Sequence, residues 1–316
     1  MLIVPGSLWV ACTVAAAAGQ TLRNAMQHSL IGSVGTAGAT HVRFLYGLPF
    51  ACVFLVLVAS TGAIRDPQMG PAFWGWLALG ALTQVLATAM MLVLMQQRSF
   101  VVSTAYIKTE PVQIALYGFI FLGDRLGLQA IAGVLVATAG VVLMSWKRPP
   151  PADADAGADA ATGEGRRASM WRAALLGIAT GSMFSFSVVG YRGAVLALGD
   201  DPFYGRATLA LVLALLLQTT LLSLYLRLRE PGRLSALVRA WKPSLLAGFL
   251  GATASQCWFL AFSLQTAAAV RTVGLVEVVF AALISRQVFA QRSGAREWGG
   301  IAMVVAGVAL LLAGTF

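Results

Sequence analysis

Long runs of apolar residues, separated by short polar stretches, make up most of this 316-residue chain. A helix needs about 20 apolar residues to cross the hydrocarbon core of a bilayer, and the runs reach that length. Transmembrane β-strands would give short alternating segments instead, so the runs predict helices. Ten spans can be drawn, at 7–27, 37–60, 72–95, 99–121, 127–146, 171–197, 203–226, 241–263, 267–289 and 296–314.

The second half of the chain repeats the first at an offset of 167 residues (277 − 110), which lays Glu110 on Glu277 and AGVVLM at 139–144 on AGVALL at 306–311. Each half holds five spans, and because five is odd, the second half must enter the membrane from the opposite face. The predicted fold class is therefore an all-α polytopic membrane protein, with ten transmembrane helices as two inverted five-helix repeats. We expect the repeats at 1–148 and 170–316, and a disordered Pro-, Ala-, Gly- and Asp-rich linker at 149–169.

Composition excludes a water-soluble domain, since 59% of residues are hydrophobic, 11% are charged and the mean hydropathy is +0.80. A net charge of +10 would suggest nucleic acid as the partner of a soluble protein, but here the basic residues gather in loops between spans. We therefore expect a lipid bilayer and a small-molecule substrate as partners, and no nucleic acid. No small-residue cleavage site follows the first apolar run, so we expect a retained span.

Two carboxylates lie deep in the predicted membrane region, Glu110 in the fourth span and Glu277 in the ninth. A charge at that depth costs about 2.5–3.5 kcal/mol, so it is kept where it faces a cavity, a partner or a substrate. Common descent of the halves would also preserve a structural glutamate, yet intramembrane ionisable groups usually mark pathways, and we favour a functional role. Pro111 predicts a bend beside Glu110, whereas Val278 in the matching position predicts that the second half lacks this bend.

Further polar residues accompany these carboxylates within the spans. Single cases also have structural explanations: arginines at helix ends can snorkel to the interface, amides can join helices, and a deep tryptophan can pack in the core. The candidate substrate- or ion-binding residues are Glu110, Glu277, Lys108, Tyr106, Gln113, Gln256, Trp258, Arg271, Arg43, Arg206, Gln20 and Arg23. Tyr106 and Gln113 fall at helix spacing on the face of Glu110, and Lys108 falls on the neighbouring face.

Two other groups of residues carry no predicted chemistry. The small residues of the fifth and tenth spans, among them Gly133 and Gly307, suit close helix packing, in a scaffold or at the seam of a homodimer. Cys12, Cys52 and Cys257 lie in separate apolar runs without ligand-like spacing, so we expect neither a metal site nor a disulfide, and no cofactor.

Several features together resemble the drug/metabolite transporter superfamily, specifically its EamA-type members. They are an arginine early in the second span of each repeat (Arg43 and Arg206), Pro111 in the fourth span, GDRL at 123–126, where the family usually has glutamate in place of Asp124, and the glycines of the fifth span. In the second half, Val278 replaces the proline and Gln291 the acidic residue. The resemblance implies secondary transport of small polar metabolites, often export, through a central cavity between the repeats.

The charges around the expected cavity indicate the substrate class. Two carboxylates suit proton coupling or an ammonium group, and the surplus of arginine and lysine suits a carboxylate, so we expect an amino acid or another zwitterion, moved across the cell (inner) membrane. Alternatives are a passive channel or facilitator and a membrane-embedded enzyme. A channel lacks support from a repeated filter motif, and an enzyme lacks support from a metal cluster, a nucleophile–base pair or a phosphate loop.

The orientation of the chain in the membrane forms our first prediction, because two arguments disagree. Relatives in the superfamily are expected by resemblance to keep both termini in the cytoplasm. The loops on the face opposite the termini, however, hold most of the loop arginines and lysines, and short basic loops stay in the cytoplasm, which places both termini outside. Because the charge rule acts directly on this sequence, we expect a cysteine introduced at 153–165 to resist a membrane-impermeant thiol reagent in intact cells. Labelling would show that the charge argument is wrong.

Overall fold

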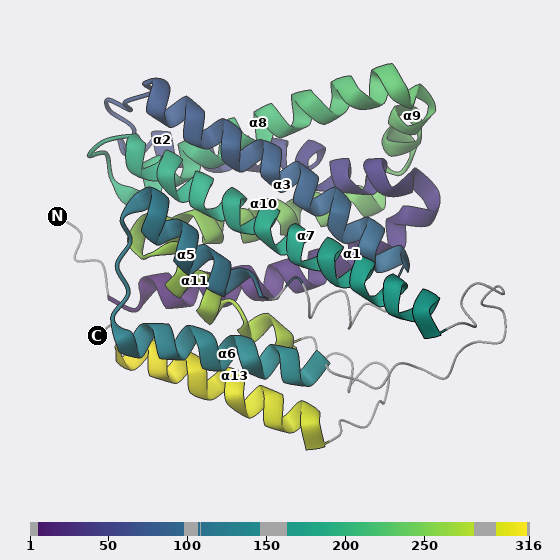
Figure 1. The fold of residues 1–316 in the computed structure, drawn as a ribbon. Coiled ribbons are helices and arrows are strands. Elements are labelled where there is room, and N and C mark those ends of the chain that lie inside the picture. Colours follow the sequence, from purple (N-terminus) through teal and green to yellow (C-terminus); the bar gives the residue numbers. More distant parts are fainter. Residues whose placement is uncertain (1–5, 98–106, 108, 146–162, 281–294, 315–316) are drawn as a thin grey trace.

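The computed structural model describes residues 6–97, 107, 109–145, 163–280 and 295–314, and these residues form helices joined by short turns, without a strand (Figure 1). The helices are α1 (Leu8–Leu45), α2 (Leu48–Ala59), α3 (Pro71–Gln97), α5 (Glu110–Leu122), α6 (Leu128–Ser145), α7 (Gly163–Ala197), α8 (Phe203–Arg229), α9 (Pro231–Arg239), α10 (Trp241–Leu264), α11 (Ala267–Val273) and α13 (Ala295–Ala313), with a further helical stretch at 276–280.

Several of these helices suit a membrane. Four stretches are long and apolar enough to cross it, namely Val34–Ala59, Pro71–Leu94, Phe203–Arg229 and Ser244–Leu264. Shorter apolar helices lie at Glu110–Leu122, Leu128–Leu143 and Trp298–Ala313. Large apolar side chains on their outer faces, such as Val56, Phe119 and Leu228, are exposed in the isolated chain and would meet lipid. The chain is thus a multi-pass membrane protein whose described residues contain helices and no strands, as the sequence predicts.

Helix α1 folds back on itself at Gly35, whose φ of 73° and ψ of 174° form a combination that only glycine adopts readily. The amide of Gln27 donates to the carbonyl oxygen of Ala39 at 2.9 Å, although residues this far apart in a straight helix would be separated by about 18 Å along its axis. The first predicted span and the start of the second therefore lie side by side, and helix replaces most of the loop expected at 28–36.

Two other predicted boundaries are wrong. Helix α7 begins at Gly163, inside the predicted linker, because the run RRASMWRAA that follows favours helix. Helix α9 occupies a stretch predicted to be a loop, and Pro231 at its start has the fixed φ that suits a first helical turn. The rest of the expected linker, 149–162, lies outside the described residues.

Both halves interrupt a helix just before the deep glutamate. In the first half a turn at Thr109 precedes α5, which begins at Glu110. In the second half α11 ends at Val273, a turn follows at 274–275, and helix resumes at 276. The prediction from Val278 that the second half lacks the bend is therefore wrong. Gly274 forms the turn where the Trp258 ring packs, since a Cβ added there would lie 2.5 Å from that ring.

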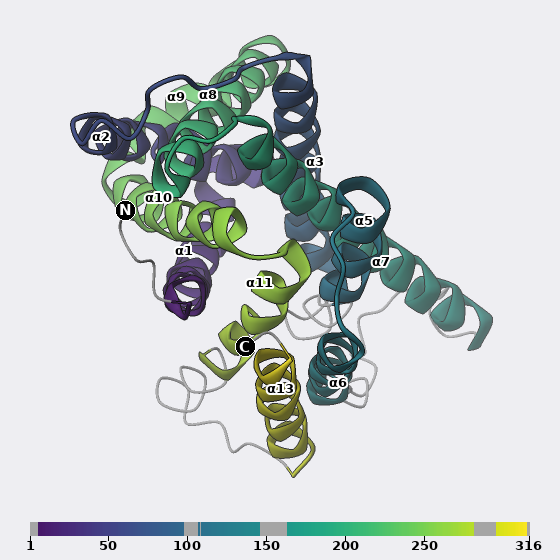
Figure 2. The same cartoon turned by 90° about the vertical axis from the view of Figure 1, so that its left-hand side faces the viewer.

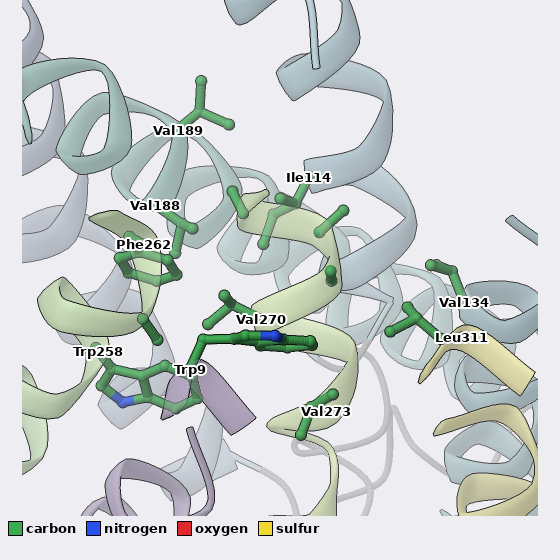
Figure 3. Close-up of a cluster of buried hydrophobic side chains, with 14 of the residues drawn as sticks. Trp9, Ile114, Val134, Val188, Val189, Trp258, Phe262, Val270, Val273 and Leu311 are labelled. Carbon is green, nitrogen blue, oxygen red and sulfur yellow. The ribbon is translucent and has the colours of Figure 1, made fainter. Parts of the chain in front are cut away.

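Helix pairing crosses between the halves of the chain. Helix α1 packs along α10, α3 along α7, and α6 along α13. Helices α6 and α13 lie together at one side of the bundle in both views (Figures 1 and 2). Around α11, a core cluster joins Trp9, Ile114, Val188, Trp258 and Val270 from five separate segments (Figure 3). Segments distant in sequence thus converge on the interrupted region beside the glutamates.

The α6–α13 contact depends on glycine, which yields a second prediction. A Cβ added at Gly133 would lie 2.7 Å from the carbonyl oxygen of Gly307, and one at Gly140 would lie 2.7 Å from that of Gly300. The small-residue faces are therefore occupied within the chain. We expect Gly133→Ala to destabilise the purified protein by about 1–3 kcal/mol, because overpacking forces the helices apart.

The matched control is Gly75→Ala in α3, where an added Cβ meets nothing within 4 Å. There, alanine should be neutral or stabilise the helix by roughly 0.5–1 kcal/mol. Thermal unfolding in detergent measures both variants. Equal midpoints for the two would contradict close α6–α13 packing.

Candidate functional site

A cavity of about 150 Å³ lies among α1, α3, α5, α7, α10 and α11. The structure brings seven of the twelve candidate residues to its wall: Gln20, Arg23, Arg43, Glu110, Trp258, Arg271 and Glu277. Both deep glutamates face this one space, although they are far apart in sequence. The cavity is therefore the candidate site, and the roles of its residues stay predictions.

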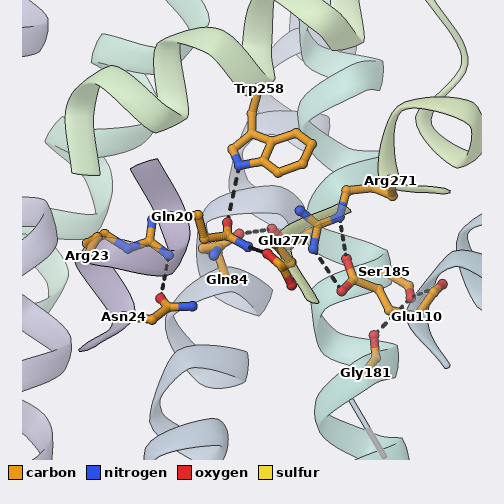
Figure 4. Close-up of polar contacts among 11 residues, drawn as sticks. Gln20, Arg23, Asn24, Gln84, Glu110, Gly181, Ser185, Trp258, Arg271 and Glu277 are labelled. Carbon is orange, nitrogen blue, oxygen red and sulfur yellow. Dashed lines mark hydrogen bonds and ion pairs between the residues drawn. The ribbon is translucent and has the colours of Figure 1, made fainter. Parts of the chain in front are cut away.

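Glu110 forms a two-point ion pair with Arg271 across the halves of the chain (Figure 4). The Arg271 Nε and Nη2 groups donate to the two carboxylate oxygens at 2.9 Å each, and Glu110 is only 1% exposed. This planar geometry is the strongest form of the arginine–carboxylate contact. The Arg271 guanidinium also lies 4.5 Å from the centre of the Trp258 ring, so its charge is paired on one side and covered on the other.

Glu277 is reached by a chain of hydrogen bonds that begins at the same tryptophan (Figure 4). The Trp258 indole N–H donates to Gln20 Oε1 at 3.1 Å, and Gln20 Nε2 donates to Glu277 Oε2 at 2.8 Å. An indole can only donate, so it fixes the orientation of the Gln20 amide and turns the amide nitrogen toward the carboxylate. Trp258 thus organises both glutamates, one through Arg271 and one through Gln20.

Helix α7 supports the Glu110 side from behind. The Ser185 hydroxyl donates to the carbonyl oxygen of Glu110 at 3.2 Å and to that of Gly181 at 2.8 Å (Figure 4). Gly181 allows this approach, since a Cβ there would lie 3.1 Å from the carbonyl oxygen of Ile107. The interrupted segment before Glu110 is therefore held directly against α7.

Two buried arginines complete the polar wall. Arg23 and Arg43 are 3% and 9% exposed, and both line the cavity. Arg23 therefore does not snorkel to an interface, as one reading of its position allowed. Arg23 Nη2 donates to Asn24 Oδ1 at 2.8 Å, and the Arg43 guanidinium lies 4.8 Å from the centre of the Phe44 ring.

Aromatic side chains form the apolar part of the wall. Trp258 and Phe262 stack with ring centres 6.0 Å apart, and Tyr191 and Phe259 pack at 4.8 Å. The Tyr191 hydroxyl accepts a hydrogen bond from Gln218 at 2.7 Å, which fixes that ring. The cavity thus combines charged groups with several rigid aromatic faces.

The other candidate residues lie elsewhere. Gln113 accepts from Ser182 at 2.7 Å between α5 and α7, Gln256 donates to Thr208 at 2.8 Å between α10 and α8, and Arg206 donates to the carbonyl oxygen of Gly199 at 3.0 Å. Each has a hydrogen-bond partner away from the cavity wall, although Gln256 Oε1 and Arg206 Nε are buried without a partner in the described part of the chain. Tyr106 and Lys108 lie outside the described residues.

One ion pair was not predicted from the sequence. Arg192 Nε and Nη2 donate to the two oxygens of Asp124 at 3.0 Å each, and Arg192 Nη1 donates to the carbonyl oxygen of Phe262 at 2.7 Å. This cluster joins the end of α5 to α7 and α10. The sequence signal was limited to the acidic residue in GDRL and an arginine near a span end, with nothing to pair them.

Residues 5–146 match the EamA-like transporter family. Among solved structures, one described as "Crystal structure of protein" is 16% identical to this chain, with a TM-score of 0.66 and coverage of 98% of each chain. That likeness shows a shared fold and nothing about activity. None of the curated proteins matches the chain. The family match confirms the resemblance to the drug/metabolite transporters.

The Glu110–Arg271 pair gives a third prediction. Arg271→Gln should destabilise the protein by about 3 kcal/mol or more, because it leaves a buried carboxylate without its cation. The double variant Glu110→Gln/Arg271→Gln should recover much of that loss, since no unpaired charge remains. Thermal unfolding of both single variants and the double variant, analysed as a double-mutant cycle, measures the coupling. Additive effects would show that the two side chains do not interact.

Proposed function

We propose that this chain, whose residues 5–146 match the EamA-like transporter family, is a secondary transporter that moves a small polar metabolite by alternating access around the cavity. The observation that carries the proposal is the cavity itself, where two deep carboxylates and three arginines from both halves face one small space. Charged groups at that depth belong to substrate or ion pathways far more often than to scaffolds. The membrane we expect is the cell (inner) membrane.

The proposed architecture is two inverted five-helix repeats. Helix pairing supports it. In such a repeat, the first span corresponds to the sixth and the third to the eighth, so the packing of the first span on the eighth (α1 on α10) has its counterpart in the packing of the sixth span on the third (α7 on α3). The fifth span and the tenth (α6 and α13) pair with each other. Interrupted helices before Glu110 and Glu277 fit the same symmetry, and such breaks are common at transporter binding sites.

The contacts across the cavity suggest how the halves would be coupled. Glu110 of the first half binds Arg271 of the second, and Glu277 of the second half accepts from Gln20 of the first. A substrate or proton that broke either contact would weaken the binding of one half of the chain to the other. Movement of the halves would then follow occupation of the cavity.

For the substrate we propose an amino acid or another zwitterion, and for the direction, export. The cavity offers both signs of charge, and its volume of about 150 Å³ suits a small molecule. A cavity of comparable size accepts benzene in another protein. Transport coupled to protons would use the deep carboxylates, whose charge a proton cancels.

Transport by the purified protein in liposomes tests this proposal and is our fourth prediction. We expect uptake of a labelled amino acid that rises above equilibrium when a proton gradient is imposed, and a loss of about tenfold or more in Glu110→Gln, because the variant removes a deep ionisable group. A passive channel would only equilibrate the label.

The matched control is Glu230→Gln, which removes the carboxylate of a partly exposed pair with Arg233, away from the cavity. It should transport like the unaltered protein. Glu110→Gln activity equal to that of the control across a pH series would assign Glu110 a structural role.

A further inference from the structure

Arg23 and Arg43 lie together at one part of the cavity because α1 folds back at Gly35. The fold-back at Gly35 places Gln27 against Ala39. Arg23 lies four residues before Gln27 and Arg43 four residues after Ala39, so the same fold-back brings the two arginines next to each other. Gly251 of α10 confirms the proximity, since a Cβ added there would lie 3.2 Å from Arg23 Cδ and 3.8 Å from Arg43 Cβ. Two cationic side chains thus share one pocket wall.

Neither arginine has a counterion among the described residues. Glu110 is bound at both oxygens by Arg271, and Glu277 accepts a hydrogen bond from Gln20. Arg23 donates to a neutral amide, and within the described part of the chain its Nε has no hydrogen-bond partner. A nearly buried guanidinium with an unused donor is costly unless a ligand supplies the acceptor.

We propose that Arg23 and Arg43 bind the carboxylate of the transported molecule, while the aromatic wall holds its apolar body. The planar arginine fork matches a carboxylate at two points, and the three arginines that line the cavity outnumber its two glutamates. Phe184, Phe259 and Phe262 offer apolar surface in the same space. The substrate class is therefore a small carboxylic acid with an aromatic or apolar side group, an assignment that rests on the proposed transport function.

Binding to the unaltered, purified protein tests the assignment without any transport step. Isothermal titration calorimetry compares two matched pairs, phenylacetate with phenylacetamide and phenylalanine with phenylalaninamide. Each pair differs only in the carboxylate. We expect at least one of the acids to bind, and each acid that binds to do so about tenfold or more tightly than its amide. Failure of both acids to bind, or equal affinity of acid and amide, would overturn the proposal.

A phosphate head group is the alternative anion, and phenyl phosphate distinguishes it. Tighter binding of phenyl phosphate than of both acids would replace the carboxylate with a phosphate and overturn the proposed substrate class. Weaker binding is expected.

Variants then locate the site. Arg23→Gln and Arg43→Gln should each weaken binding of the acid about tenfold or more and leave the affinity for the amide nearly unchanged, whereas Arg23→Lys should retain part of the preference for the acid. The control Arg229→Gln removes an exposed arginine at the end of α8 and should leave both affinities unchanged. An unchanged acid-to-amide ratio in Arg23→Gln and in Arg43→Gln would overturn the assignment of these residues.

The outcomes separate this inference from the proposed function. Selective binding of the acid without transport in liposomes would retain the carboxylate site and reject the transporter. Transport of a molecule that binds without regard to its carboxylate would retain the transporter and reject the site. Because selectivity is first measured on the unaltered protein, the test does not depend on whether either arginine variant folds.

Discussion

The structure depends on the cost of placing charge inside a lipid-embedded helix bundle. Each carboxylate or guanidinium at that depth must be paired, hydrogen-bonded or turned toward a cavity. Here that requirement is met largely across the halves, since the partner of Glu110 is Arg271 and a donor to Glu277 is Gln20. Separating the halves would leave these groups unsatisfied in an apolar medium. The same contacts that define the cavity therefore hold the two halves of the bundle together.

Local backbone irregularities serve this electrostatic arrangement. The fold-back at Gly35 places polar residues of the first span against those of the second, and the interruptions before Glu110 and Glu277 let short helices approach the cavity end-on. Trp258 reaches into the turn at Gly274, where any side chain would collide with its ring. From that position it covers Arg271 and orients Gln20. One aromatic residue thus links the broken helix to both glutamates.

Much of the fold could be predicted from the sequence, because apolar length and the cost of deep charge act locally. The runs around α3, α8, α10 and α13 predicted these helices to within a few residues, and the repeat offset predicted that Glu110 and Glu277 correspond. Contacts that depend on tertiary distance could not be predicted. Nothing in the spacing of Asp124 and Arg192 indicates their pairing, and nothing in Gln113 or Gln256 shows which neighbouring helix each contacts. The bend at Gly274 was missed because proline was taken as its only cause, whereas a glycine that admits a tryptophan ring serves as well.

The two cross-bundle ion pairs differ in how readily they could exchange partners. The side chains of Arg271 and Arg192 are equally exposed, at 11%, whereas the carboxylates differ, with Glu110 at 2% and Asp124 at 12%. Breaking a buried pair leaves a bare charge, but water that reaches the carboxylate compensates part of that loss. Arg192 also releases backbone carbonyls at the end of α10 when it moves, and water or a new donor can satisfy these at a helix end. Separation of α5, α7 and α10 therefore costs less at the Arg192–Asp124 end than at the Glu110–Arg271 pair. In the proposed alternating-access cycle, the Glu110–Arg271 pair would separate only when a ligand or a proton took the place of the lost partner.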